Sequence, residues 1–151
     1  MSALTVMDKP PAMSTHAIRD AHGAEIKLAD MPGDLVIMNL WATWCAPCME
    51  EMPTLGALQR HYDPARVHVV PVNLDEDADK DKAAAELSQL TQGALPLYMN
   101  SDRAVLFDIQ AAGMPTTIFY RHGKEIARLS GGANWDSPEA HAAIEAALQT
   151  P

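Results

Sequence analysis

Residues 39–53, with the sequence NLWATWCAPCMEEMP, contain both cysteines of the 151-residue chain. Cys45 and Cys48 are separated by two residues and follow Leu35–Trp41, a nearly continuous apolar run that is typical of a strand buried on both faces. After the second cysteine, residues 48–62 carry apolar side chains at helical spacing, interrupted by a proline that predicts a kink. The cysteine pair therefore lies where a buried strand passes into the first turn of a helix.

A purely structural role for the pair is the weaker interpretation. In a chain-entropy model, a disulfide that closes a four-residue loop stabilises a fold by about 2 kcal/mol, against about 4.7 kcal/mol for a loop of 100 residues. A structural zinc site needs about four ligands, and the sequence has no second Cys pair or His pair at suitable spacing. We expect no bound metal.

The helix start predicts different roles for the two thiols. Backbone N–H groups and the positive end of the helix dipole favour a thiolate at this point, which makes Cys45 the predicted nucleophile. Cys48, one turn later and facing the helix interior, would be shielded from outside attack and suits a resolving role. Pro47 restricts the backbone between them without losing a hydrogen bond, because first-turn N–H groups have no intrahelical partner.

Further segments accompany the motif WATWCAPC: HAIRDAHGAEIKL (16–28), EEMP (50–53), VNLDED (72–77) and GMPTTIFY (113–120). Together they resemble the thioredoxin superfamily, and more closely its TlpA/ResA-like branch of exported or membrane-tethered thiol-disulfide oxidoreductases. The resemblance covers nearly the whole chain and implies an enzyme that exchanges disulfides with other proteins.

The resemblance also implies a proton acceptor for the buried thiol. Ordinary thioredoxins have a buried acid where this chain has Asn39, and an amide cannot accept the proton. Another carboxylate is needed, and Asp75 and Glu76 are the candidates. The ResA-like pattern favours Glu76, which is therefore predicted to be catalytic; the alternative is a solvated acid at a strand-helix junction.

The predicted client-binding surface surrounds the first cysteine. In the family, a cis proline packs beside the CxxC motif, and the residue before it offers backbone groups to an extended peptide. Pro115 matches that proline and Met114 the residue before it, whereas a trans proline at a strand entry is the alternative. Trp44 and Pro47 are expected to complete the surface.

Periodicity and turn residues predict one domain of the α/β class, with a mixed β-sheet flanked by helices. The resemblance implies that this is a single thioredoxin-like domain over residues 1–151. An N-terminal β-hairpin is expected at residues 16–28, and a second hairpin joins strands at residues 116–120 and 125–130. Pro71 lies within the strand expected at residues 67–74, and its missing N–H predicts an edge-like or bulged position. The other predicted elements are a helix at 77–92, a short strand at 97–99, a helical piece at 103–109 and a C-terminal helix capped by Ser137.

Charge and hydropathy restrict the partners. The formal net charge of −9 disfavours nucleic acid and anionic lipid surfaces. No run approaches the roughly 20 apolar residues of a membrane span, and residues 1–11 do not resemble a signal peptide, so any export or anchor segment would be absent from this chain.

The resemblance implies a periplasmic reductant of protein disulfides, and we expect it to need no cofactor and to act as a monomer. A membrane thiol-reductase would donate its electrons, and its clients would belong to cytochrome c or cytochrome oxidase maturation. Two alternatives remain: a cytosolic thioredoxin-type reductase, and a chaperone that binds Cu(I) through the same cysteines.

Overall fold

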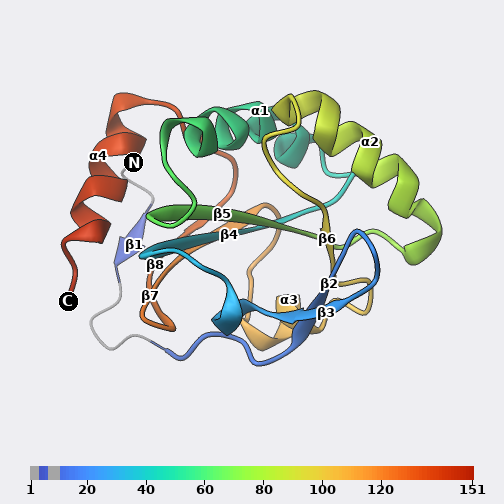
Figure 1. Cartoon of the computed structure of the whole chain (residues 1–151), viewed down its shortest axis with the longest axis horizontal. Coiled ribbons are helices and arrows are strands. Elements are labelled where there is room, and N and C mark those ends of the chain that lie inside the picture. Colours follow the sequence, from blue (N-terminus) through green and yellow to red (C-terminus); the bar gives the residue numbers. More distant parts are fainter. Residues whose placement is uncertain (1–3, 7–10) are drawn as a thin grey trace.

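The computed structural model describes residues 4–6 and 11–151. Its strands are β1 (Thr5–Val6), β2 (Ala17–Asp20), β3 (Glu25–Lys27), β4 (Leu35–Trp41), β5 (Val67–Asn73), β6 (Tyr98–Met99), β7 (Thr116–Arg121) and β8 (Lys124–Ser130). Its α-helices are α1 (Ala46–His61), α2 (Lys80–Thr91), α3 (Ala104–Asp108) and α4 (Pro138–Leu148). The strands form one sheet in the order β1-β8-β7-β4-β5-β6-β2-β3 (Figure 1).

The sheet is mixed, as the sequence predicts. Strand β4 pairs in parallel with β5 on one side and antiparallel with β7 on the other. The two predicted hairpins are confirmed, since β2 pairs antiparallel with β3 and β7 with β8. The pairing of β1 with β8 has no counterpart in the sequence analysis, because a two-residue strand has too few side chains to produce a periodic pattern.

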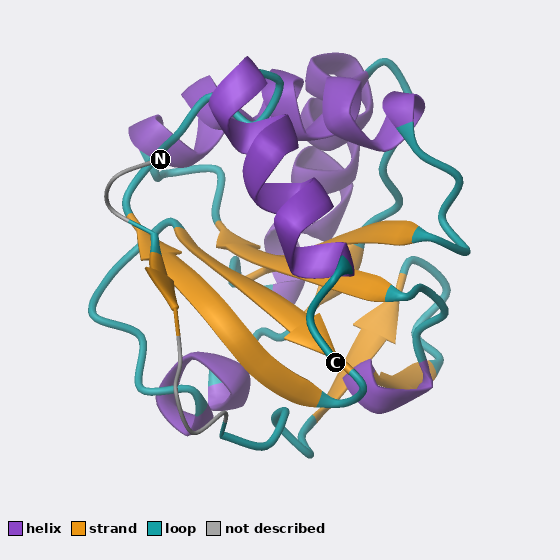
Figure 2. Cartoon of the chain, turned by 90° about the vertical axis from the view of Figure 1, so that its left-hand side faces the viewer, coloured by secondary structure: helices purple, strands orange, loops and turns teal. Residues whose placement is uncertain are grey.

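Helices α1, α2 and α4 cover one face of the sheet, and α3 lies on the other (Figures 1 and 2). Side chains of β4 alternate between two buried clusters, as expected for a strand covered on both faces. Leu35, Ile37 and Trp41 pack with Cys48 and the apolar side of α1. The even-numbered residues of β4 pack on the opposite face, beside α3.

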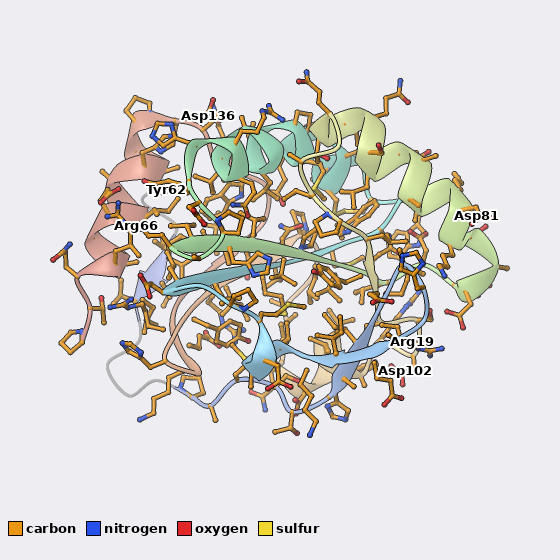
Figure 3. All side chains as sticks on the ribbon, viewed as in Figure 1. Arg19, Tyr62, Arg66, Asp81, Asp102 and Asp136 are labelled. Carbon is orange, nitrogen blue, oxygen red and sulfur yellow. A yellow bond between two sulfur atoms is a disulfide. The ribbon has the colours of Figure 1, made fainter. Side chains whose placement is uncertain are left out.

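Helix α4 is held to the end of α1 by polar contacts at the surface. The Tyr62 hydroxyl donates to Glu145 Oε1 at 2.8 Å, and Arg66 Nη2 lies 3.3 Å from Glu145 Oε2. Figure 3 shows Tyr62 and Arg66 together beside α4, whereas side chains fill the space between the helices and the sheet. None of the helices within the described ranges combines the length and apolar composition of a membrane span.

The predicted edge-like or bulged position of Pro71 is wrong, because β5 lies inside the sheet between β4 and β6. Along a strand, backbone N–H groups point alternately to the two neighbours. Leu74 N donates to Trp41 O of β4, and Val69 N, pointing to the other side, is satisfied by the Gln59 side chain. The Pro71 nitrogen therefore faces the side of the short β6, whose pairing begins only opposite Val72, so no ladder bond is lost.

Close contact between α1 and α2 depends on Gly56. A Cβ atom at this position would lie 2.9 Å from Thr91 Cβ and 3.0 Å from Thr91 Cα. Thr91 is fully buried, and its hydroxyl donates to Leu87 O, so it has little freedom to withdraw.

We therefore expect Gly56→Ala to lower the free energy of unfolding by about 1–3 kcal/mol through overpacking, despite the higher helix propensity of alanine. Urea denaturation measures the change. Gly113→Ala, where an added Cβ meets no atom within 4 Å, serves as the control and should leave stability nearly unchanged. Equal stability of Gly56→Ala and the parent protein would contradict this account of the helix contact.

Candidate active site

Cys45 and Cys48 form a disulfide at the start of α1, with their Cα atoms 5.3 Å apart. Cys45 is the N-cap residue and Pro47 lies in the first turn, so the pair belongs to the helix start, where backbone N–H groups lack intrahelical partners. Cys45 is 7% exposed and Cys48 is completely buried. The environments of the two sulfurs thus differ in the sense expected for a nucleophile and a resolving cysteine.

The loops around the disulfide meet because three strands end or begin at one edge. In the parallel β4–β5 pair, Trp41 lies opposite Asn73, so both strands end together. In the antiparallel β4–β7 pair, Leu40 lies opposite Thr116, so β7 begins where β4 ends. The segment containing Pro115 therefore enters the sheet beside the segment that leads to Cys45.

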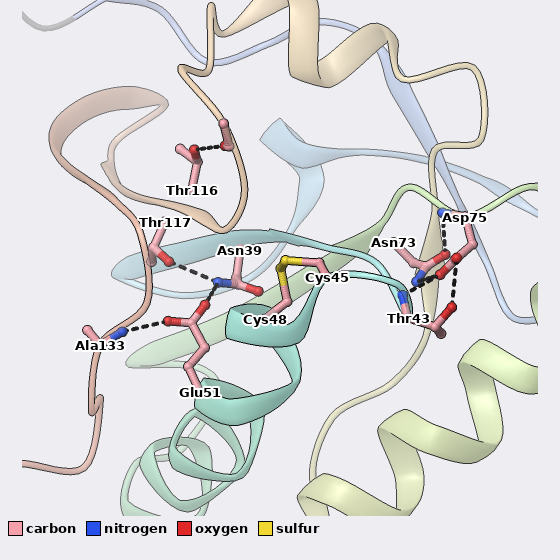
Figure 4. The surroundings of a disulfide bond; sticks show 11 residues. Asn39, Thr43, Cys45, Cys48, Glu51, Asn73, Asp75, Thr116, Thr117 and Ala133 are labelled. Atoms are coloured by element: carbon pink, nitrogen blue, oxygen red, sulfur yellow. Dashed lines mark hydrogen bonds between the residues drawn. A yellow bond between two sulfur atoms is a disulfide. The ribbon is translucent and has the colours of Figure 1, made fainter.

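Asp75 supports the loop before the cysteines. Its carboxylate is buried and accepts hydrogen bonds from Thr43 N at 2.9 Å, Thr43 Oγ1 at 2.8 Å and Asn73 Nδ2 at 2.7 Å. Figure 4 shows these contacts on the Thr43 side of the disulfide. Asp75 therefore holds the loop, and the next residue, Glu76, has an exposed side chain that makes none of these contacts.

The buried carboxyl group beneath Cys48 belongs to Glu51, which lies three residues further along α1. Only 3% of Glu51 is exposed. Its Oε1 accepts from Asn39 Nδ2 at 2.7 Å, and its Oε2 accepts from Ala133 N at 3.0 Å (Figure 4). Oε2 also accepts from Trp135 Nε1 at 3.0 Å. Burial raises the pKa of the Glu51 carboxyl, while these three hydrogen bonds act in the opposite direction.

The sequence analysis missed Glu51 as a site residue, although a signal for it was present. A residue three positions after Cys48 lies on the same face of the helix, and that face is the buried stripe that continues through Met52 and Leu55. An acid within such a stripe requires buried donors. Those donors come from β4 and from the chain between β8 and α4, which local sequence cannot place.

The remaining predicted site residues lie on the loops at this edge and in the first turn of α1. The Met114–Pro115 bond is cis, as predicted, and Pro115 is buried while Met114 is half-buried. The Trp44 side chain is 60% exposed, and the Arg103 guanidinium lies 5.6 Å from the centroid of its ring. Pro47 is exposed at the first turn of α1. Within residues 4–6 and 11–151, no group of three or more His, Cys, Asp or Glu side chains is arranged to hold a metal ion.

Comparison with known proteins gives the family. A family model described as the AhpC/TSA family matches residues 6–128. The chain belongs to this family. It is 29% identical over 121 residues to the thiol-disulfide oxidoreductase ResA of Bacillus subtilis strain 168, covering 80% of this chain and 65% of the relative. A ResA from Oceanobacillus iheyensis is 34% identical over 108 residues, covering 72% of this chain and 55% of the relative.

Solved structures are similar over nearly the whole chain. A Chlorobium tepidum protein assigned as the thiol:disulfide interchange protein DsbE superposes with a TM-score of 0.78 at 27% identity, covering 94% of this chain and 99% of the other. StoA from Bacillus subtilis superposes with a TM-score of 0.67 at 19% identity, covering 89% and 98%. The predicted thioredoxin-like fold and the predicted TlpA/ResA-like resemblance are confirmed.

The raised pKa of Glu51 predicts how stability depends on pH. Between the ordinary carboxyl pKa of 4.5 and the higher folded-state value, the folded protein binds more protons at this site than the unfolded chain. The free energy of unfolding therefore falls as pH rises through this window. We expect Glu51→Gln to remove the part of this decrease in the free energy of unfolding that comes from Glu51. Urea denaturation at pH values from about 4 to about 8 measures it.

Glu50→Gln is the matched control for this measurement, because Glu50 is the preceding residue on α1 and is exposed. It should leave the pH dependence of the parent protein in place. An unchanged pH dependence in Glu51→Gln would mean that Glu51 does not titrate differently in the folded and unfolded states.

Proposed function

We propose that this protein is a thiol-disulfide oxidoreductase that reduces disulfides of other proteins through a Cys45–Cys48 dithiol/disulfide cycle. The observation that carries the proposal is that the two bonded sulfurs differ in burial and surroundings. One lies at a helix N-cap at the edge of the surface, and the other is fully buried above a buried carboxyl group. Membership of the AhpC/TSA family and similarity to proteins named ResA and DsbE support the same chemistry.

The cycle begins with the reduced pair. The Cys45 thiolate attacks one sulfur of a client disulfide, a mixed disulfide forms, and the other client sulfur leaves as a thiolate that takes a proton from water. Cys48 then loses its thiol proton to a carboxylate and attacks Cys45 Sγ. The Cys45–Cys48 bond forms, the mixed disulfide breaks, and the client has gained the two electrons that the pair has lost.

We assign the proton acceptor to Glu51 in place of the predicted Glu76. Glu51 is buried on the same helix face as Cys48, and its raised pKa brings the carboxylate closer in proton affinity to a thiol. Glu76 is exposed after β5, and the neighbouring Asp75 already accepts three hydrogen bonds from the Thr43 loop.

Client segments are proposed to bind across Trp44, Pro47, Met114 and Pro115. An extended peptide can pair briefly with the backbone beside Met114, as added strands do at other sheet edges and loops. The exposed Trp44 ring supplies apolar contact area beside Cys45. The client class contains disulfides by definition, and we place nucleic acid outside it because of the net charge of −9.

We further propose a periplasmic location, a monomeric state and electron supply from a membrane thiol-reductase. Protein disulfides form and persist in oxidising compartments, where a reductant that acts on selected clients has substrates. The proposed clients are those of the cytochrome c or cytochrome oxidase maturation type, in which cysteines must be reduced before haem or copper binds.

Replacing the resolving cysteine should trap clients. We expect Cys48→Ser, mixed with a disulfide-containing peptide, to accumulate a covalent complex through Cys45 that is visible on a non-reducing gel and disappears with reductant. Cys45→Ser and the double variant are controls that should form no such complex. Absence of the complex from Cys48→Ser, with Cys45 shown to be free by thiol titration, would refute disulfide exchange as the function.

The proton acceptor is tested by comparing three isosteric variants. We expect Glu51→Gln to slow release of the peptide from the mixed disulfide by about 10²-fold, the usual contribution of a positioned general base. Glu76→Gln and the surface control Glu50→Gln should leave the rate near that of the parent protein. A slow Glu76→Gln beside a normal Glu51→Gln would return the role to Glu76.

A further inference from the structure

Asn39 is a buried polar residue that the cycle described above leaves without a function of its own. It lies in the middle of β4, has no exposed surface, and has apolar neighbours in sequence. Its side chain points to the same face of the sheet as Ile37 and Trp41, since alternate residues of a strand share a face. That face is packed against Cys48 and the buried side of α1.

Both amide hydrogens of Asn39 are engaged. Nδ2 donates to Glu51 Oε1 at 2.7 Å and to Thr117 Oγ1 at 2.9 Å. These two acceptors determine the orientation of the amide, because a reversed amide would set its oxygen against the Glu51 carboxylate. The carbonyl oxygen Oδ1 must therefore point away from Glu51 Oε1.

Asn39 Oδ1 is buried and has no hydrogen-bond partner among the residues that the structure describes. Figure 4 shows it turned toward the disulfide, on the side of Cys48. A buried carbonyl oxygen without a donor costs free energy, and a disulfide has no hydrogen to offer it. Reduction changes this, because breaking the S–S bond takes up two electrons, leaves Cys45 as a thiolate and, with one proton, places an S–H group on Cys48.

We propose that the Cys48 thiol of the reduced protein donates its hydrogen to Asn39 Oδ1. Asn39 is then a positioning residue with two functions: Nδ2 holds the Glu51 carboxylate, and Oδ1 holds the Cys48 thiol. The inference rests on the proposed dithiol/disulfide cycle. It adds that the amide stabilises the reduced state relative to the oxidised state, because only the reduced state satisfies Oδ1.

The first test observes the thiol directly by infrared spectroscopy. In Cys45→Ala, Cys48 is the remaining cysteine, and its S–H stretching band should lie below the frequency of a free thiol. Adding Asn39→Leu should move the band up to the free position. Adding Thr117→Val, which removes an Nδ2 acceptor and leaves Oδ1 untouched, is the matched control and should leave the band in place.

Two results of this test would overturn the inference. One is a band at the free-thiol position in Cys45→Ala with Asn39 present, which decides the question even if Asn39→Leu does not fold. The other is a lowered band that Asn39→Leu does not move, since the acceptor would then be another group.

The second test measures the equilibrium with glutathione. We expect Asn39→Leu to reduce the equilibrium constant for forming the dithiol about tenfold, the size of effect expected for one buried hydrogen bond, which equals a fall of about 30 mV in a two-electron potential. The comparison is repeated in a Glu51→Gln background, where no buried carboxyl remains to titrate. Loss of the effect in that background would mean that Asn39 acts only through Glu51, which would overturn the inference.

Neither readout requires a protein client. If Cys48→Ser traps no peptide while the S–H band is lowered by Asn39, the proposed function fails and the hydrogen bond stands. If peptides are trapped while the S–H band lies at the free-thiol position, the proposed hydrogen bond is refuted and the proposed function stands.

Discussion

The arrangement of the helical layer and of the site depends on the hydrogen bonds that the buried Glu51 carboxyl group accepts. Its two oxygens accept hydrogen bonds from β4 through Asn39 and from the chain before α4 through Ala133 and Trp135. A buried carboxyl group is costly unless such donors are in place. The donors therefore tie α1 to the sheet and to the segment that leads into α4, where the fully buried Trp135 also packs against Phe119.

The same contacts make the two sulfurs unequal. Cys45 remains at the edge of the surface, at a helix end that favours negative charge. Cys48 lies inward and is fully buried, with the Glu51 carboxyl group on the same helix face. Two identical side chains one helical turn apart thus lie in different environments, because that turn crosses the boundary between the surface and the core.

Strand pairing brings the rest of the site to this boundary. The parallel neighbour of β4 ends beside it and delivers Asp75 to the Thr43 loop, while the antiparallel neighbour begins there and delivers Pro115. At the end of a strand with one parallel and one antiparallel neighbour, the loop that leaves the parallel strand and the loop that enters the antiparallel strand lie at the same edge. The redox pair, the support of its loop and the proposed client surface therefore share one end of the sheet without any long connection between them.

The sequence by itself determined the local elements and the place of the cysteine pair. Apolar continuity identified β4, helical spacing identified α1, and the junction between them located Cys45 and Cys48, because each of these signals lies within a few residues. The mixed sheet and both hairpins also followed from turn residues and periodicity. The resemblance carried by WATWCAPC and GMPTTIFY correctly predicted the family's cis proline at Pro115.

Only the tertiary structure decided which groups surround the buried sulfur. The position of Pro71 inside the sheet depends on where the short β6 begins. The burial of Glu51 and the exposure of Glu76, on which the proposed choice of proton acceptor rests, also follow from packing. Asn39 donates hydrogen bonds to Glu51, 12 residues away in sequence, and to Thr117, 78 residues away. The Glu51 carboxylate in turn accepts a hydrogen bond from Trp135. Local sequence cannot specify such contacts, because burial and hydrogen bonding between distant segments arise only when the helices have packed on the sheet.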